Sequence, residues 1–441
     1  MDTVGVAVIG FGTVGTGVVK ILLRDADRLA DACGVRLVLR HVVDVDLKRP
    51  RAVHLPRGLL TDDLKRVLAD QEVGVAVETV GGTTVAVDIM KRLLAAGKDV
   101  VTANKAALAV RWPELFAAAR QAGRSISFEA SCAAGIPVIR AIRDGLIANR
   151  ISGLTAILNG TCNYILTRMT ETGVSYDQAL GEAQEKGFAE PDAALDVSGE
   201  DTRHKLAVMG GVAFGAEIRL QDVYVEGIAG IDPSDITYGG QLGYILKLLA
   251  IGRLVDGRMS LRVHPTFVPK GNPLATVSGV NNAVLVTGDA VGDTFYHGPG
   301  AGMMPTASSI VADIIDAALG RARTTFAALA WLAGRKTVPV QVQPIHEIRT
   351  RCYLRFDVAD RPGVLAGIAG ILGREEISIA SVLQHESADP EKVPLVIATH
   401  TAREGNMISA MEEIRRLETI RGRCIRIRIL DDEPTGEQAS R

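Results

Sequence analysis

The stretch Val4-Gly5-Val6-Ala7-Val8-Ile9-Gly10-Phe11-Gly12-Thr13-Val14-Gly15 decides the fold of this chain. An apolar run typical of a buried strand leads into the glycines, and a helical pattern follows them. Gly10 permits a tight turn, Gly12 lets a pyrophosphate approach the backbone, and Gly15 allows the helix to pack closely on the strand. Because the helix N-terminus also attracts anions, the motif predicts dinucleotide binding by residues 10–15.

Short runs rich in Val and Ile alternate with helical patterns over residues 1–130. This alternation is typical of βαβ units and a parallel sheet. We expect strands at residues 4–9, 35–43, 73–78, 99–102 and 125–128, with an amphipathic helix over 84–96. The fold class is therefore α/β, and the N-terminal domain is predicted to be a Rossmann-like doubly wound sheet.

Residues 131–340 mix the two kinds of pattern and predict a central α+β domain. Proline near the first turn favours a helix from Pro305 to about residue 320, within a segment to residue 335 that is expected to pack back on the dinucleotide domain. The other expected helices are at 137–148, 176–186 and 202–212, and the expected strands are at 154–158, 261–267 and 283–287.

A third module follows the prolines at 339 and 344, which mark a linker. Residues 350–430 predict a ferredoxin-like order of strand, helix, strand, strand, helix and strand. These elements are expected at 352–358, 364–374, 379–384, 395–400, 407–417 and 423–429. Residues 431–441 are polar and charged, and we expect them to be disordered.

The composition excludes several classes of protein. With 441 residues, the chain exceeds what one core usually organises, and its 47% apolar but 4% aromatic content suits buried parallel strands. A net charge of -2 gives no broad field for a nucleic acid or an anionic membrane, so small molecules are the expected partners. Five cysteines without a CxxC pair, no signal peptide and no apolar run of about 18 residues predict a cytoplasmic protein.

The choice between nicotinamide cofactors stays open in the sequence. Asp44 closes the second expected strand, where a carboxylate accepts a ribose 2'-hydroxyl. Arg40 and Arg57 would instead meet a 2'-phosphate. NADPH is the expected cofactor, with NADH as the alternative.

Two further clusters carry charged groups. Thr102-Ala103-Asn104-Lys105 ends the fourth expected strand, where open α/β sheets bind ligands, although Lys105 also fits a solvated helix start. The second cluster is Gly187-Phe188-Ala189-Glu190-Pro191-Asp192, followed by Asp196, Asp201 and Lys205. Asp201 and Lys205 share a helix face, as in a routine ion pair, but the acidic density upstream favours a site for a cationic, amino-acid-like substrate.

Taken together, these motifs resemble the homoserine dehydrogenase family over residues 1–340. The resemblance also rests on Asn159-Gly160-Thr161-Cys162-Asn163-Tyr164 and on Gly298-Pro299-Gly300-Ala301-Gly302. It implies that Lys205 is the proton donor and that Lys105 lies beside nicotinamide and substrate. It also implies substrate contacts for Glu190, Asp196, Asp201, Gly160, Thr161 and Gly187, and cofactor contacts for Thr102, Lys105 and the turn at Gly302.

The same resemblance implies a monovalent cation, usually sodium. Its expected ligands are the carboxylate of Glu129 and backbone carbonyl groups at Cys132, Ala134 and Ile136. A hard cation is held by oxygen, so a cysteine at position 132 is compatible with the site.

The turn Asp360-Arg361-Pro362-Gly363-Val364-Leu365 resembles that of the ACT family of ligand-binding regulatory domains. Its backbone N–H groups at a helix start can receive an amino-acid carboxylate, although a purely structural turn has the same pattern. By resemblance the expected effector is threonine, and the expected assembly is a homodimer or a tetramer.

The expected reaction is reduction of aspartate semialdehyde to homoserine. A phosphorylating semialdehyde dehydrogenase is a rival, but it needs a nucleophilic cysteine with a partner histidine, and neither Cys132 nor Cys162 has a histidine at a suggestive position. A catalytically silent sensor of nucleotide and amino acid is the second rival, and the two lysines with the acidic cluster argue against it.

Overall fold

The computed structural model describes residues 1–328, 340–385, 389 and 391–431, which form two compact units. Unit 1 comprises Met1–Ile151, His204–Gln221 and Asn282–Pro339, and unit 2 comprises Ser152–Arg203, Asp222–Asn281 and Val340–Arg441. Three sequence expectations lie outside the described residues, namely the linker proline at 339, the helical segment beyond 328 and the tail from 432 onward.

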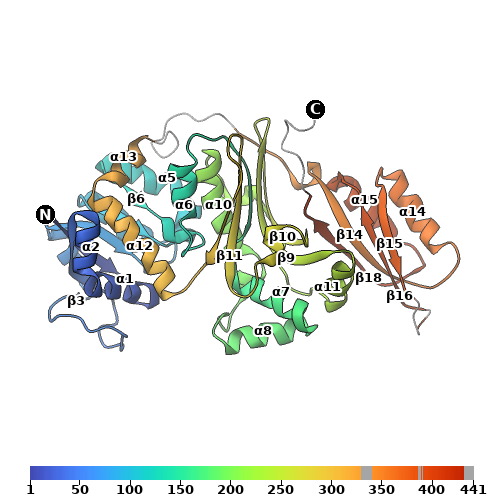
Figure 1. Ribbon diagram of the computed structural model, residues 1–441, viewed down its shortest axis with the longest axis horizontal. Helices are drawn as coiled ribbons and strands as arrows, with labels where there is room; N and C mark the ends of the chain where they lie inside the picture. The colour runs from blue at the N-terminus through green and yellow to red at the C-terminus, as the bar shows by residue number, and fades with distance from the viewer. Residues whose placement is uncertain (329–339, 386–388, 390, 432–441) are drawn as a thin grey trace. The chain divides into compact units, whose positions relative to one another are not determined.

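A parallel sheet organises unit 1, with the strand order β3-β2-β1-β4-β5-β6 (Figure 1). The chain moves outward from β1 in one direction and then restarts at β4 in the other, which is the doubly wound order. The Rossmann-like prediction is therefore confirmed. The strands are β1 (Asp2–Ile9), β2 (Val35–Val43), β3 (Leu60–Thr61), β4 (Val73–Glu78), β5 (Asp99–Thr102) and β6 (Ile126–Ser127).

Three helices pack into one apolar core with this sheet: α1 (Thr13–Arg24), α2 (Ala26–Cys33) and α12 (Met303–Ala318) (Figure 1). Although α12 comes late in the chain, its Ile310 and Ile314 lie fully buried in the same cluster as Val18 of α1. Unit 1 also contains α3 (Leu64–Ala69), α4 (Val85–Ala95), α5 (Lys105–Ala122), the hairpin β11 (Asn281–Gly288) with β12 (Gly292–Pro299), and α13 (Arg321–Ala328).

The helix expected at 137–148 is shorter and differently wound than predicted. It consists of α6 (Val138–Arg140) and a π-helical turn over Ala141–Gly145, in which the Leu146 amide donates to the Ala141 carbonyl. Apolar spacing predicted the helix, but its start depends on Glu129, whose carboxylate accepts the Ile139 and Arg140 amides. A cap from a residue nine positions upstream is not visible in local periodicity.

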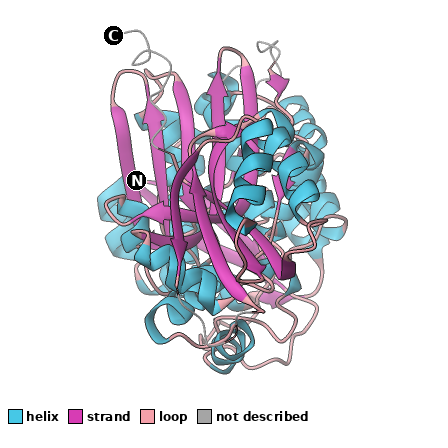
Figure 2. Ribbon diagram, turned by 90° about the vertical axis from the view of Figure 1, so that its right-hand side faces the viewer, coloured by secondary structure: helices cyan, strands magenta, loops and turns pink. Residues whose placement is uncertain are grey.

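Unit 2 is built on one mixed sheet in the order β7-β9-β10-β18-β14-β16-β15, whose long strands are seen in Figure 2. The C-terminal module joins the central strands directly, because Thr266 of β10 pairs in parallel with Arg428 of β18. The strands are β7 (Ile151–Ile157), β8 (Val223–Val225), β9 (Tyr244–Val255), β10 (Arg258–Pro269), β13 (Gln341–Val342), β14 (Arg349–Val358), β15 (Ile379–Gln384), β16 (Val393–Thr399), β17 (Ala402–Arg403) and β18 (Ile420–Ile429).

The C-terminal part of unit 2 has the predicted ferredoxin-like order, with two helices packed on one face of its strands (Figure 1). The predictions at 364–374 and 379–384 match α14 and β15 residue for residue. The sequence reading left β9, β12 and α7 unassigned. The helices are α7 (Gly160–Thr172), α8 (Tyr176–Glu185), α9 (Ala194–Val197), α10 (Glu200–Phe214, shared by both units), α11 (Pro233–Gln241), α14 (Val364–Arg374) and α15 (Glu404–Ile414).

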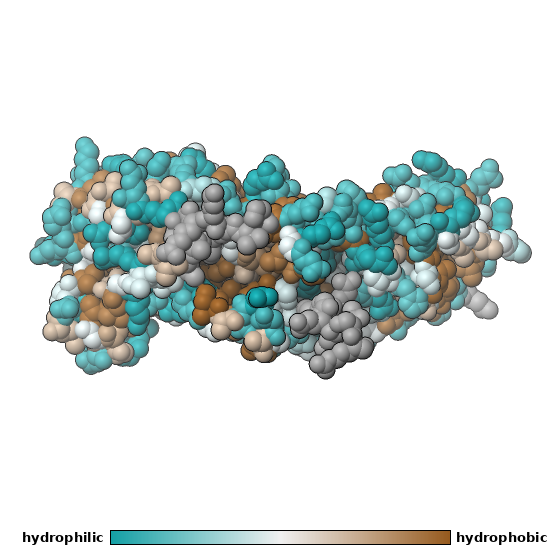
Figure 3. Space-filling view, turned by 90° about the horizontal axis from the view of Figure 1, so that it is seen from above, coloured by the Kyte–Doolittle hydropathy of each residue, from teal (hydrophilic) through white to brown (hydrophobic). Residues whose placement is uncertain are grey.

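Hydrophilic side chains are spread over the face of the molecule seen in Figure 3, with hydrophobic ones among them. Among the described residues, no helix has both the length and the apolar character needed to cross a membrane.

Candidate active site

The glycine loop has the geometry that its sequence predicts. Gly10 has a φ of +96°, and a Cβ on Gly15 would lie 2.0 Å from the Gly10 carbonyl oxygen, so both positions exclude larger residues. A Cβ on Gly12 would meet nothing within 4 Å, so the space in front of this backbone is open. Since Gly12 also caps α1, amide groups of the first helical turn border this space, as a pyrophosphate requires.

Asp44 and Arg51 complete the loop. The Phe11 amide donates to Asp44 Oδ2 at 2.6 Å, and the Arg51 guanidinium lies over the Phe11 ring at 5.0 Å. Arg51 Nε also donates to the Phe11 carbonyl, and Nη2 lies 3.4 Å from Asp44. The loop therefore has both a carboxylate and a guanidinium beside it. Sequence reasoning missed Arg51, whose basic stretch reads as a solvated loop.

Arg40 lies elsewhere, which corrects its expected role. Its Nε donates to Asp70 Oδ2 at 2.8 Å, and it also pairs with Glu72. Both acidic residues precede β4 and so lie at the amino end of that strand, whereas the glycine loop follows the carboxyl end of β1. Arg40 is thus directed away from the position of a 2'-phosphate.

The segment after β5 starts α5 with Lys105. Thr102 donates to Glu78 Oε2 at 2.7 Å, and Asn104 accepts the Ala107 amide as the helix cap. Glu78 also accepts the amides of Val80 and Gly81. These bonds hold the carboxyl ends of β4 and β5 in fixed positions, so Lys105 begins its helix at the edge of the sheet where ligands bind.

Lys105 and Lys205 both lie near Cys132. The Cys132 thiol donates to the Lys205 carbonyl oxygen at 3.4 Å, and the charges of both lysines lower the pKa of this thiol. Burial has the larger effect and raises that pKa to about 12. Lys105 and Lys205, from separate segments of unit 1, are thus both close enough to this thiol to influence its charge. A thiol with this pKa is not a nucleophile, which argues against the phosphorylating rival.

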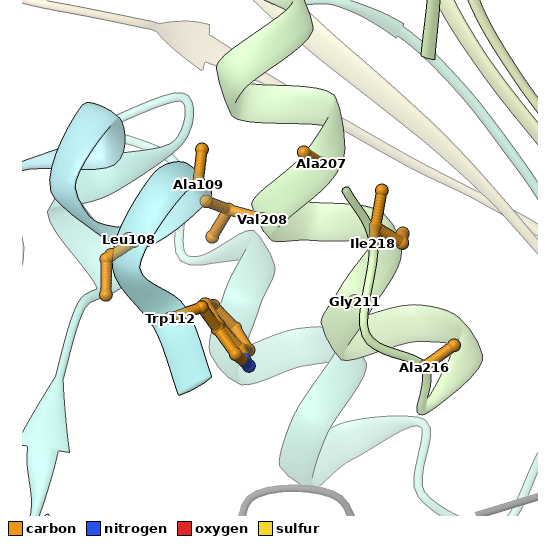
Figure 4. Close-up of a pocket in the computed structure, with 8 residues that line it drawn as sticks. All are labelled: Leu108, Ala109, Trp112, Ala207, Val208, Gly211, Ala216 and Ile218. Carbon is orange, nitrogen blue, oxygen red and sulfur yellow. The ribbon is translucent and has the colours of Figure 1, made fainter. Parts of the chain in front are cut away.

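The packing of α5 on α10 accounts for this proximity. Figure 4 shows Leu108 and Trp112 of α5 across a small cavity from Ala207, Val208 and Gly211 of α10. Its volume of about 10 Å³ holds roughly one water, so the two helices are closely packed. Lys105 and Lys205 lie at the start of these facing stretches.

In unit 2, the side chain of one asparagine is hydrogen-bonded to two carboxylates. Asn159 Nδ2 donates to Asp196 Oδ1 at 2.7 Å and to Asp201 Oδ2 at 2.9 Å, while its Oδ1 caps α7. Thr161 donates to the other Asp196 oxygen at 3.1 Å and to the Phe188 carbonyl. The structure therefore brings together Asp196, Asp201 and Thr161, with Asn159 as a further member whose role the sequence did not predict.

Three other expected substrate residues have simpler surroundings. Glu190 and Gly187 are exposed in the loop between α8 and α9, and Gly187 has a φ of +71°. Gly160 begins α7, and a Cβ there would lie 2.6 Å from the Val280 carbonyl oxygen. The first two positions are open to solvent, while Gly160 serves a close backbone approach.

The loop expected to bind a cation is buried and tightly connected. Glu129 is 3% exposed, and burial, followed by the nearby Asp313 carboxylate, raises its pKa to about 7. Ala134 donates to the Gly300 carbonyl, and its own carbonyl accepts from Ser309 at 2.5 Å. Gly302 caps α12 with a φ of +122°. The loop at Cys132, Ala134 and Ile136 is thereby held against the turn at 298–302.

The turn of the C-terminal module has the predicted form. Gly363 caps α14 with a φ of +92°, a conformation that favours glycine. Arg361, on the same turn, pairs with Glu391 at 3.3 Å. The turn thus presents the backbone of a helix start, as the sequence predicted.

These features define a dinucleotide-binding enzyme of the Rossmann class with a C-terminal ferredoxin-like module. Comparison with known protein families matches residues 10–129 to the homoserine dehydrogenase NAD-binding domain, 137–315 to homoserine dehydrogenase, and 353–419 to the ACT domain. The chain belongs to the homoserine dehydrogenase family, whose members are NAD(P)-dependent oxidoreductases. The resemblance predicted from sequence is confirmed.

Individual relatives agree along nearly the whole chain. A Pseudomonas aeruginosa homoserine dehydrogenase is 40% identical and covers 97% of this chain and 99% of its own length. The crystal structure of a Thiobacillus denitrificans homoserine dehydrogenase has a TM-score of 0.91 at 39% identity, over 98% and 99% of the two chains. A hyperthermophilic archaeal homoserine dehydrogenase in complex with NADPH has a TM-score of 0.59 at 25% identity, over 72% and 98%.

Proposed function

We propose that this chain reduces L-aspartate 4-semialdehyde to L-homoserine, with Lys205 as the proton donor. The observation that carries the assignment of residues is the packing of α5 on α10, which places Lys105 and Lys205 at the start of two facing stretches, with the Lys205 carbonyl on the Cys132 thiol. Residues 10–15 would hold a reduced nicotinamide dinucleotide, which would supply the hydride for the reduction. Lys205 protonates the developing alkoxide, and Lys105 stabilises negative charge on the same oxygen.

The acidic cluster of unit 2 supports the choice of substrate. Asp196 and Asp201 share the Asn159 amide, so their oxygens are fixed before a substrate arrives. Two positioned carboxylates suit the ammonium group of an amino-acid substrate. Thr161 and Gly160 shape the same segment, and Glu190 and Gly187 border it from the exposed loop.

The test follows homoserine oxidation at 340 nm. Lys205→Ala should lower kcat by about 10²-fold or more, the range of general acid–base catalysis, while cofactor binding stays within twofold. Lys186→Ala, a lysine that donates to Tyr164 outside this cluster, is the control and should keep its activity. Near-normal turnover of Lys205→Ala would remove this residue from the mechanism, and an inactive wild-type chain would favour the silent sensor.

NADPH is the proposed preferred cofactor, with Arg51 as the 2'-phosphate partner. The support is the position of Arg51 beside the glycine loop, together with the archaeal relative bound to NADPH. Arg51→Gln should lower the ratio of kcat/KM for NADPH over NADH by about tenfold or more, since a charged hydrogen bond contributes about 1.5–3 kcal/mol. Arg40→Gln is the matched control and should leave this ratio unchanged.

A monovalent cation, most simply Na⁺, is proposed at Glu129 and the carbonyls of Cys132, Ala134 and Ile136. A buried carboxylate with a raised pKa and a constrained loop of carbonyls suit a hard cation. Replacing NaCl by tetramethylammonium chloride should lower both activity and melting temperature, and Glu129→Gln should abolish that difference.

Threonine is the proposed effector at residues 360–365, in a homodimer or tetramer in the cytoplasm, with domains at 1–130, 131–340 and 350–430. Threonine should alter the initial rate of the wild-type chain and have a weaker effect on Asp360→Ala, which changes an exposed residue of the turn. A rate independent of threonine would reject the effector, and light scattering would give the assembly.

A further inference from the structure

One face of the hairpin β9–β10 is polar although it lies inside unit 2. Alternate residues of a strand share a face, which places Arg258, Ser260, Arg262, His264 and Thr266 together. Ser260, His264 and Thr266 are each at most 5% exposed. The opposite face of the same strand carries Met259, Leu261, Val263 and Phe267, which pack as ordinary core.

This polar face borders a cavity of about 380 Å³. The other walls come from the segment 343–350 and from residues 428–431 at the end of β18. The volume falls within the range of about 300–1,000 Å³ that is usual for small-molecule sites. The cavity lies where the C-terminal module joins the central strands, at the pairing of Thr266 with Arg428.

Basic residues outnumber acidic ones in the lining of this cavity. Arg253, Arg258, Arg262, Arg349 and Arg428 line the cavity. The acidic lining residues are Glu347, which pairs with Arg258, and Asp431, which lies 3.7 Å from Arg351.

Arg428 is already held at the cavity wall. Its Nε donates to Glu404 at 2.7 Å, and its Nη1 donates to Glu226 at 2.8 Å. Its guanidinium is therefore fixed in place by protein carboxylates. The planar fork of the other arginines matches the oxygens of a carboxylate or a phosphate.

His264 supplies an independent sign of a ligand. It is 1% exposed, lines the same cavity, and its Nε2 atom has no hydrogen-bond partner among the described residues. Its Nδ1 lies 2.8 Å from the Thr266 hydroxyl and 3.1 Å from the Pro265 carbonyl oxygen. Nε2 carries the proton in the tautomer in which the hydroxyl donates to Nδ1, and accepts in the tautomer in which Nδ1 donates to the carbonyl, so in either case it is a buried polar atom open to a ligand. Buried polar nitrogens are normally satisfied by protein, water or a bound molecule.

We propose that this cavity is a binding site for a small metabolite bearing carboxylate or phosphate groups. The site is separate from the turn at 360–365 and does not depend on the dehydrogenase reaction. A ligand bound here would contact both β10 and the end of β18. Its binding would therefore stabilise the junction between the central strands and the C-terminal module.

Isothermal titration calorimetry tests the site on the full chain. Sodium phosphate and sodium malate are titrated separately, with sodium chloride of equal Na⁺ concentration as the reference. We expect saturable binding of one anion per chain for at least one of the two. Phosphate binding alone would assign a phosphorylated ligand, and malate binding alone would assign a carboxylate ligand.

A double variant tests whether the anions bind in this cavity. Arg262→Gln with Arg349→Gln should weaken the binding at least tenfold. The control, Arg36→Gln with Arg374→Gln, removes the same charge from arginines that are 45% and 61% exposed, and should bind within twofold of wild type. Should the double variant not fold, Arg349→Gln alone is measured, because this side chain is exposed.

Two results would overturn the proposal. One is the absence of saturable binding of both anions above the chloride reference. The other is equal weakening in the cavity variant and in its control, which would mean that the anions respond to overall charge.

Discussion

The buried ion pair of Asp235 and Arg355 gives the sharpest test of how the C-terminal module is attached within unit 2. Asp235 belongs to α11 and Arg355 to β14, and their side chains are 2% and 5% exposed. Arg355 donates to both Asp235 oxygens, at 2.6 and 3.0 Å, and the Tyr353 hydroxyl donates to the first of them at 2.9 Å. We predict a large loss of stability for Asp235→Ala.

The magnitude follows from what remains around Arg355. Removing one partner of a buried pair costs about 3–5 kcal/mol, because the other charge stays buried without it. Arg355 would keep its bond to Asp357 at 2.9 Å, so we expect the lower end, about 3 kcal/mol. The surface contact of Arg423 with Asp232, at 3.4 Å and 63% exposure of the arginine, should contribute less than about 1 kcal/mol.

Urea unfolding followed by far-UV circular dichroism measures these differences, and hydrogen exchange of the β14 peptides locates them. Asp235→Ala is compared with Arg355→Met, with the double variant and with the control Arg423→Ala. The double variant should be clearly more stable than the sum of the two single changes predicts. A loss below about 1 kcal/mol for Asp235→Ala, or strict additivity, would refute the reasoning.

Three further predictions rest on single residues. Gly12→Ala should keep the wild-type melting temperature yet weaken dinucleotide binding about tenfold or more, whereas Gly15→Ala should lose stability too, because its Cβ would lie 2.0 Å from a carbonyl oxygen. Burial lowers the pKa of Lys247 to about 8, so the unfolded chain binds more protons than the folded one between pH 8 and about 10.4. The free energy of unfolding should therefore rise by about 1.4 kcal/mol per pH unit in that window, relative to Lys247→Met. Cys132, fully buried, should react with a thiol reagent at pH 8 only after denaturation, whereas half-buried Cys33 should react in the native chain; equal rates would contradict this.

Local patterns were sufficient for much of the fold. The strands at 35–43, 73–78 and 99–102 match the structure at both ends. The last two are buried almost throughout and so give short apolar runs, whereas the first alternates buried and exposed residues over most of its length. β9 was missed for a related reason. Its buried residues include Lys247, and its run of Leu, Ile and Ala does not distinguish a strand from a buried helix.

Some residues of the candidate site could likewise be predicted from local sequence, and others could not. The glycines of the site could be predicted from sequence, because a turn with positive φ favours glycine whatever surrounds it. Arg40 and Arg51 could not be separated by position in the sequence, because the partner of a long side chain depends on which residues the sheet brings near. Asp70 engages Arg40, while the ring of Phe11 lies under Arg51.

By itself, the sequence determined the strand-turn-helix of the dinucleotide loop, the doubly wound class and the ferredoxin-like module, because each follows from periodicity and turn chemistry over a few neighbouring residues. Tertiary structure alone decided that α5 and α10 pack with their lysines near Cys132, that Asn159 joins two carboxylates, and that β10 pairs with β18. These features join residues that are far apart in the chain. A local sequence pattern cannot predict which distant side chain will pair with a buried charge.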